Sequence, residues 1–201
     1  MSLYLGTNKV KLRSLSALPY SVVGNVSITD GVASGFTDKT DYLTLGAFNP
    51  DTNKWRFTTK AKFNSLSANM SLIDRNSGTR CFQIAMRTNG KWRVNMSNNG
   101  SSKANEVDGT HTCSINTIYY LSFEYTGTEY ILKYSTDNIN WVTDITISNS
   151  SPIYSASLCM GHSWYSSGSE KWDGEIYMRF THLDIEGQYT DTWKLHCLEG
   201  N

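Results

Sequence analysis

The stretch from Thr117 to Ile147 constrains the fold more than any other part of the chain. Its apolar residues recur with a period of two, which is typical of β-strands that have one buried and one solvated face. The apolar residues of its first two strands are Tyr119, Leu121, Phe123, Tyr125, Tyr130, Leu132 and Tyr134. Turns at Gly127 and at Asp137-Asn138 separate these strands from a third, which begins near Trp141 and places Thr143 and Ile145 on the same face. A meander of three strands cannot bury its apolar face alone, so a second sheet is expected.

Two further segments show the same alternation. Residues 54–63 alternate between an apolar face and a basic face, and the basic face either binds an acidic glycan or is simply solvated and discourages edge pairing. The pair Asn89-Gly90 predicts a hairpin turn between strands at 81–87 and 91–96. The residues of this hairpin expected in the core are Phe82, Ile84, Met86, Trp92, Val94 and Met96.

The last strong strand runs from Gly174 to Ile185, and its apolar phase changes along its length. Ile176, Met178 and Phe180 are even-numbered, whereas Leu183 and Ile185 are odd-numbered, which predicts a bulge near Thr181-His182. No segment has the helical period of 3.6 over a useful length. The fold predicted is all-β, an antiparallel two-sheet jelly-roll sandwich.

With 201 residues, the chain fits one large β domain. Residues 1–24 differ from the rest, with a short apolar segment at Leu3–Leu5 followed by basic residues, and we expect an N-terminal arm or linker that packs on another protein. The alternative is a loosely held terminus. Residues 25–201 are expected to form the jelly-roll domain.

Composition excludes several classes of function. The formal net charge is +0, whereas a nucleic-acid-binding protein normally has a basic excess. No apolar run approaches the roughly 20 residues that span a bilayer, so membrane insertion is not expected. No stretch resembles a signal peptide, so we expect the chain to be made in a cytoplasm. The four cysteines have no Cys-x-x-Cys spacing, which argues against a zinc site, and a reducing compartment argues against disulfides.

Carboxylates near the C-terminal strand suggest a glycosidase at first sight. Glu170 and Glu175 have the separation seen in some glucanases, but Asp173 is three residues after Glu170 and so points to the opposite face of a strand. Calcium is a second alternative, for which the candidate loop oxygens are those of Asp41, Asp137, Asn138 and Asp173. Their spacing matches no calcium loop, so no catalytic residue, metal ion or cofactor is predicted.

The best candidate for a ligand site is the loop that runs from His162 to Asp173. Sugar recognition needs flat rings that cover C–H faces and polar groups that bind hydroxyls, and a Ser/Gly-rich loop with Trp and Tyr offers both. The predicted ligand-binding residues are His162, Trp164, Tyr165, Trp172 and Asp173, with Asn98 and Asn99 as a second, weaker candidate. The alternative is that Trp164 or Trp172 caps the end of the core.

Several of these segments occur in an order that resembles a known family. They are the strand Tyr42–Leu45, the strand that opens with Trp55-Arg56-Phe57-Thr58, Leu72-Ile73-Asp74, the Asn89-Gly90 hairpin, the meander, and LCMGHSW followed by WDGEIYMRF. Residues 25 to 186 resemble the concanavalin A-like lectin/glucanase jelly roll in its laminin-G-like form. The two ends of the chain also resemble proteins of phages and prophages, in which such domains occur in tail and other virion-surface proteins.

The resemblance implies a non-enzymatic domain that binds glycans on a cell surface, in a virion made in the cytoplasm of a bacterial host. The N-terminal arm would contact other virion proteins, and a homo-oligomer is possible. Two alternatives remain: a purely structural virion protein without a ligand and, more remotely, a glycoside hydrolase.

Overall fold

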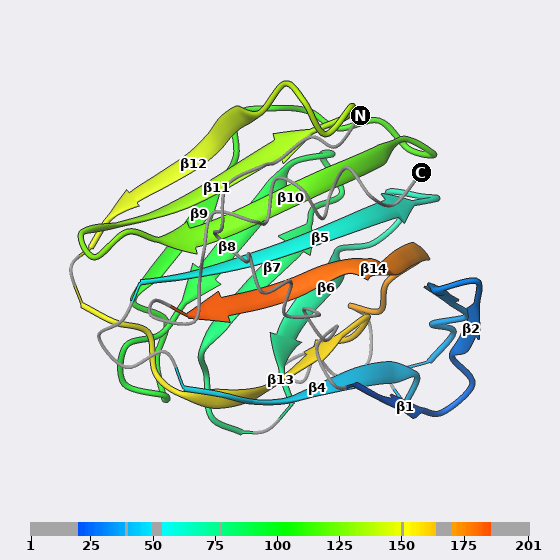
Figure 1. Cartoon of the computed structure of the whole chain (residues 1–201), viewed down its shortest axis with the longest axis horizontal. Coiled ribbons are helices and arrows are strands. Elements are labelled where there is room, and N and C mark those ends of the chain that lie inside the picture. The colour runs from blue at the N-terminus through cyan, green and yellow to red at the C-terminus, as the bar shows by residue number, and fades with distance from the viewer. Residues whose placement is uncertain are drawn as a thin grey trace, which may run out of the picture.

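The computed structural model describes residues 20–38, 40–49, 54–76, 78–149, 151–163 and 170–185, and these residues form fourteen strands and no helix. The first sheet has the order β1-β4-β13-β6-β7-β8-β9 and the second the order β12-β11-β10-β5-β14-β3-β2 (Figure 1). The strands of the first sheet are Ser21–Val23 (β1), Tyr42–Phe48 (β4), Met70–Arg75 (β6), Phe82–Met86 (β7), Trp92–Met96 (β8), Asn105–Asp108 (β9) and Ala156–Met160 (β13). Those of the second are Ser27–Thr29 (β2), Val32–Ser34 (β3), Trp55–Phe63 (β5), Ile118–Tyr125 (β10), Glu129–Ser135 (β11), Val142–Ser148 (β12) and Gly174–Ile185 (β14). All neighbouring strands are antiparallel, which confirms the predicted fold class.

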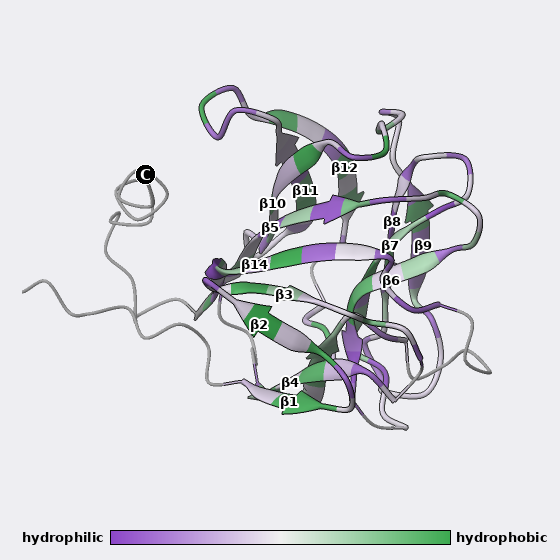
Figure 2. Ribbon diagram, turned by 90° about the vertical axis from the view of Figure 1, so that its right-hand side faces the viewer, coloured by the Kyte–Doolittle hydropathy of each residue, from purple (hydrophilic) through white to green (hydrophobic). Residues whose placement is uncertain are grey.

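The two sheets form separate layers (Figure 2). The buried side chains between them make the core. The apolar residues predicted from the β10–β11 part of the meander and from the β7–β8 hairpin are buried, apart from Tyr134, which is partly buried. Aromatic rings join the layers: Trp55 of β5 stacks on Phe82 of β7 with ring centroids 5.4 Å apart, and Phe123 of β10 lies against both. Gly90 has φ 76°, as the tight β7–β8 turn requires.

The third strand of the meander differs from the prediction. β12 begins at Val142, and its pairing with β11 shifts register beside Leu132 and Lys133. This bulge places Ile145 and Ile147 in the core and leaves Thr143 exposed, so Thr143 and Ile145 do not share a face.

The bulge predicted in the last strand is confirmed. The pairing of β14 with β5 shifts register between Tyr177 and His182. Within the shift, Thr181 is fully buried; its Oγ1 lies 2.9 Å from Oγ1 of Thr59 and donates to the carbonyl of Tyr177 at 3.2 Å.

The last residues of the predicted arm are paired into the first sheet. Residues Ser21–Val23 form β1, which pairs with β4 at the edge of the first sheet, because Val22 and Val23 continue a ladder opposite Leu43 and Tyr42. Gly24 follows with φ 74°, and a Cβ there would lie 2.2 Å from Oδ1 of Asp41. Residues 1–19 of the predicted arm lie outside the described residues.

Candidate functional site

A bulge in β6 creates the first part of the site. The pairing of β6 with β7 shifts register between Ser71 and Ile73, so Leu72 and Ile73 are both buried in the core. Ser71 and Asp74 therefore face outward on the same side, although three residues separate them. The bulge thus delivers a carboxylate to the outer face of the first sheet.

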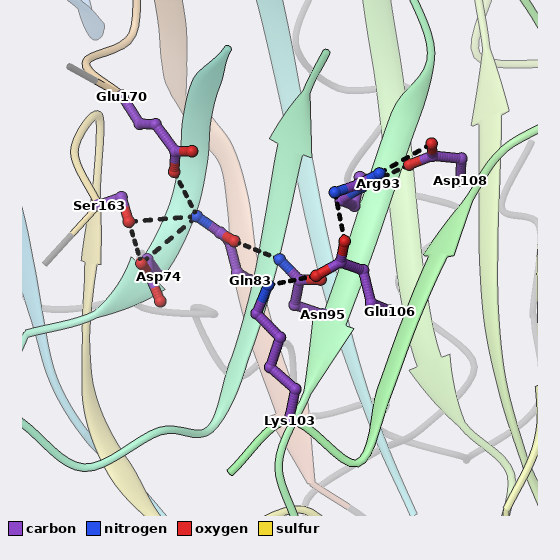
Figure 3. A network of polar contacts seen from close by, with 9 residues as sticks. All are labelled: Asp74, Gln83, Arg93, Asn95, Lys103, Glu106, Asp108, Ser163 and Glu170. Carbon is purple, nitrogen blue, oxygen red and sulfur yellow. Dashed lines mark hydrogen bonds and ion pairs between the residues drawn. The ribbon is translucent and has the colours of Figure 1, made fainter. Parts of the chain in front are cut away.

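The β7–β8 hairpin supplies the next part. Gln83 and Asn95 lie directly opposite each other, and Nδ2 of Asn95 donates to Oε1 of Gln83 at 2.6 Å. This hydrogen bond directs Nε2 of Gln83 toward β6, where Oδ2 of Asp74 lies 3.4 Å away (Figure 3). The two amides and the carboxylate form a continuous polar row across three strands.

Two segments after β13 close the site on its β6 side. The Ser163 hydroxyl donates to Oδ2 of Asp74 at 2.7 Å, and Oε2 of Glu170 lies 3.2 Å from Nε2 of Gln83 (Figure 3). The backbone carbonyl of Glu170 also accepts from the N–H of Ser71 at 3.2 Å, which seats this segment at the β6 bulge. Five of these side chains line one pocket: Asp74, Gln83, Asn95, Ser163 and Glu170. The sequence-predicted loop is therefore anchored at the pocket through Ser163 and Glu170.

Asp74 has unusual electrostatics. Burial raises the pKa of its carboxyl to about 6, and the charge of Glu170 acts in the same direction. Hydrogen bonds from the Ser163 hydroxyl and the Arg75 N–H, together with the Arg75 charge, limit the rise in pKa. A carboxyl whose protonation state changes near neutral pH in a polar pocket is a feature typical of functional sites.

The opposite side of the pocket carries charges that pair with one another. Arg93 of β8 binds Asp108 of β9 with two parallel hydrogen bonds and also binds Glu106 (Figure 3). Lys103 pairs with Glu106 as well. Hydrogen bonds from Arg93 and Lys103 lower the pKa of Asp108 and Glu106 respectively. These pairs fix the β8–β9 edge and neutralise its cations.

The structure places the described residues of the predicted C-terminal loop in different surroundings. Trp172 is fully buried and stacks on Trp92 with ring centroids 6.3 Å apart. It is therefore a core residue, and its ring offers no face to a sugar. His162 is also buried, with its ring 5.9 Å from that of Tyr42. Asp173 is exposed, and its nearest described side-chain partner is Nδ2 of Asn64 at 3.4 Å. Trp164 and Tyr165 lie outside the described residues.

The second predicted candidate has a structural role. Oδ1 of Asn99 accepts hydrogen bonds from the backbone N–H groups of Ser101 and Ser102, each at 3.0 Å, which closes a turn. Nδ2 of Asn98 donates to the carbonyl of Ser151 at 3.2 Å and ties this turn to a neighbouring loop. Neither asparagine lines the pocket.

The other carboxylates considered from the sequence are bound elsewhere. Glu170 contacts Gln83 in the first sheet, whereas Glu175 pairs with Lys62 at 2.6 Å in the second, so these glutamates do not face each other as a hydrolytic pair. Asp41 and Asp137 accept hydrogen bonds from the backbone of their own turns, which occupies the oxygens considered for calcium. The described residues contain no group of three or more acidic, histidine or cysteine side chains that could hold a metal ion.

Three cations of the predicted basic face of β5 contact side chains of the neighbouring strands. Arg56 pairs with Glu124 of β10, and Lys62 pairs with Glu175 of β14. Nζ of Lys60 lies 4.4 Å from the ring centroid of Tyr177 and 4.6 Å from that of Phe180, a cation–π arrangement.

Three cysteines, Cys81, Cys113 and Cys159, are buried free thiols, and burial raises the pKa of each. No helix among the described residues is long and apolar enough to span a bilayer.

Sequence reasoning missed the polar row because its members look like ordinary solvent-facing residues. The hairpin signal at Asn89-Gly90 did not give their register: a two-residue loop there would pair Gln83 with Met96, whereas the observed three-residue loop, 88–90, places Gln83 opposite Asn95. Nothing in the sequence marks the β6 bulge that adds Asp74.

The sequence matches no protein-family model and no curated protein. Its fold resembles solved structures. The binding domain of botulinum neurotoxin DC, in complex with rat synaptotagmin II, has a TM-score of 0.57 and 12% identity over 90% of this chain and 46% of that chain. The chain thus spans about half the length of that toxin structure.

Two smaller modules match over most of their own length. The carbohydrate-binding module CBM66 from Bacillus subtilis has a TM-score of 0.53 and 10% identity over 84% of this chain and 97% of that one. The CBM40 module of the Ruminococcus gnavus IT-sialidase, bound to α2,3-sialyllactose, has a TM-score of 0.52 and 13% identity over 74% of this chain and 83% of that one. At these identities the likeness shows the fold alone, an antiparallel all-β sandwich of the jelly-roll type.

Proposed function

We propose that this protein is a non-catalytic carbohydrate-binding domain and that the pocket over β6, β7 and β8 holds the sugar. The observation that carries the proposal is the polar row of Asp74, Gln83 and Asn95 on the outer face of a rigid sheet. Oδ1 of Asn95 is buried without a hydrogen-bond partner among the described residues, so the row is incomplete until a donor arrives.

The fold supports this proposal by analogy. Two of the modules that share it are carbohydrate-binding modules, one of them bound to sialyllactose. Because one fold hosts many functions, the proposal rests on the residues of the site, and the shared fold adds only supporting evidence. The separate partners of Glu170 and Glu175 favour binding over hydrolysis.

The proposal is tested by screening the purified protein on a glycan array and measuring the affinity of the strongest ligand by calorimetry. We expect Gln83→Ala to weaken binding by about tenfold or more, because Gln83 joins the two ends of the polar row. Its side chain is only partly buried, so we expect a change of less than about 1 kcal/mol in the free energy of unfolding.

Thr146→Ala is the matched control, because Thr146 is exposed on β12 of the other sheet. It should leave affinity unchanged. Equal affinity in Gln83→Ala and the wild type would move the ligand site away from this pocket, and the absence of any bound glycan would refute the function.

We further propose, from the sequence resemblance alone, that the domain acts at the surface of a phage particle. Mass spectrometry of purified particles from a lysogen that encodes the chain would detect it if it is a virion protein. Particles that contain the chain but show no glycan binding would favour the purely structural role.

A further inference from the structure

The side-chain nitrogen of Gln83 is surrounded by more hydrogen-bond acceptors than it can satisfy. Four acceptor atoms surround Nε2 of Gln83 at 3.2–3.4 Å: Oγ of Ser71, Oδ2 of Asp74, Oγ of Ser163 and Oε2 of Glu170. An amide nitrogen has two hydrogens, so it satisfies at most two of them well. The amide cannot be reversed to relieve this, because its oxygen accepts from Nδ2 of Asn95.

Asn95 adds an independent observation. Its side chain is 9% exposed, it lines the pocket, and its Oδ1 has no partner among the described residues. A buried acceptor without a donor destabilises the free protein, and a ligand O–H or N–H removes that penalty. Both observations point to a ligand that donates hydrogen bonds.

The charges around the pocket indicate what else the ligand carries. Arg93 and Lys103 pair with Asp108 and Glu106, and Nη1 of Arg75 donates to the carbonyl of Gly78 at 3.0 Å. Arg80 and Arg87 also line the pocket, so repulsion of an anion applies to a group seated on the pocket floor. The floor itself holds two carboxylates, those of Asp74 and Glu170. An anionic group placed there would be repelled by both.

We propose that the pocket selects an uncharged sugar, whose adjacent hydroxyls donate to the carboxylates of Asp74 and Glu170 and to the amide oxygen of Asn95. This inference rests on the carbohydrate-binding function proposed above and names the class of ligand. Glycans whose terminal sugar carries a carboxylate or sulfate are rejected.

The protonation of Asp74 gives the inference a readout of its own. A hydroxyl donor binds the ionised carboxylate better than the neutral acid, so affinity is full above the pKa of about 6 and falls as pH drops below it. The charged groups that face Asp74 are Arg75 from its own strand and Glu170 from the loop, and the thiols of Cys81 and Cys159 remain neutral because burial raises their pKa.

The experiment compares neutral, carboxylated and sulfated glycans on one array, followed by calorimetry of the strongest neutral ligand at about pH 7.5 and about pH 5. We expect neutral glycans to bind best, and the wild-type affinity to fall by about tenfold or more at the lower pH. Asp74→Asn should lose about tenfold at the higher pH and show no further loss at the lower one. Asn95→Ala should lose about fivefold or more, and it provides a second variant if Asp74→Asn folds poorly.

His162→Gln is the control for the pH response, since histidine is the other residue type that titrates in this range. A pH response that disappears in His162→Gln and persists in Asp74→Asn would overturn the role of Asp74. Preferential binding of acidic glycans that Arg87→Gln abolishes would overturn the neutral class but leave carbohydrate binding intact, because Arg87 lines the pocket as a cation. Binding of no glycan at all would refute the proposed function itself.

Discussion

At the scale of single residues, Asp74 is where stability and binding make opposite demands. Its carboxyl has a pKa of about 6 in the folded protein against an ordinary value of 3.8, so the folded state holds the proton more tightly than the unfolded state. Stability therefore falls as pH rises through the window from 3.8 to about 6, and the cost persists at higher pH. The charged form that the ligand needs is the form that folding disfavours.

Asp74→Asn tests this at the level of stability. The unfolding free energy of the variant minus that of the wild type should increase by on the order of 2 kcal/mol as pH rises from about 4 to about 7.5. The reason is that the variant lacks the buried charge that Asp74 acquires over this range. Urea denaturation at several pH values measures the difference. A wild-type-to-variant difference that does not change with pH would show that Asp74 does not titrate in this window.

At the scale of elements, Asp41 fixes the connections around β1, β2 and β4. It has no exposed surface, and its carboxylate accepts from the backbone N–H groups of Asn25, Thr37 and Asp38 at 2.7–3.0 Å. These hydrogen bonds lower its pKa to about 2. The stability they contribute is present above the ordinary pKa of 3.8 and is lost as pH falls toward 2.

We expect Asp41→Ala to cost at least about 2 kcal/mol of unfolding free energy near neutral pH, because it removes the buried acceptor shared by three backbone N–H groups. Asp38→Asn is the matched control; Asp38 is exposed and accepts one hydrogen bond, from the N–H of Thr40 at 3.3 Å, so its effect should stay within about 0.5 kcal/mol. Chemical denaturation of both variants measures the two changes. Equal effects would show that Asp41 does not stabilise these connections.

The elements also show what sequence could and could not predict. β10, β11 and the β7–β8 hairpin follow from alternation and from Asn89-Gly90, because both are local signals. The bulges of β6 and β12 shift the phase by one residue without a local mark, and the β14 bulge was visible only because apolar residues flank it on both sides. The site depends on the β6 bulge, so it was missed, and the burial of Trp172 was decided by tertiary packing against Trp92.

At the scale of the whole molecule, the first sheet ends at β1, and this bears on how the N-terminal segment can be used. If residues 1–19 act as a docking arm, their deletion should leave the melting temperature within about 2 °C and remove any oligomer seen by light scattering. Deletion through Gly24 also removes β1 and uncovers the edge of β4, and should lower the melting temperature by about 4 °C or more. A large loss from the shorter deletion would assign residues 1–19 to the folded domain.

The reactivity of the three buried cysteines can report how often the surrounding structure opens. A thiol whose pKa is raised by burial reacts with a disulfide reagent only when the surrounding structure opens, so the modification rate measures the frequency of opening. Cys159 donates to the carbonyl of Arg75 beside the pocket, whereas Cys113 contacts the Tyr119 end of the core. Comparing the modification rates of these two thiols would reveal whether the first sheet opens locally or the whole sandwich unfolds at once. The measurement needs no spectroscopic label attached to the protein.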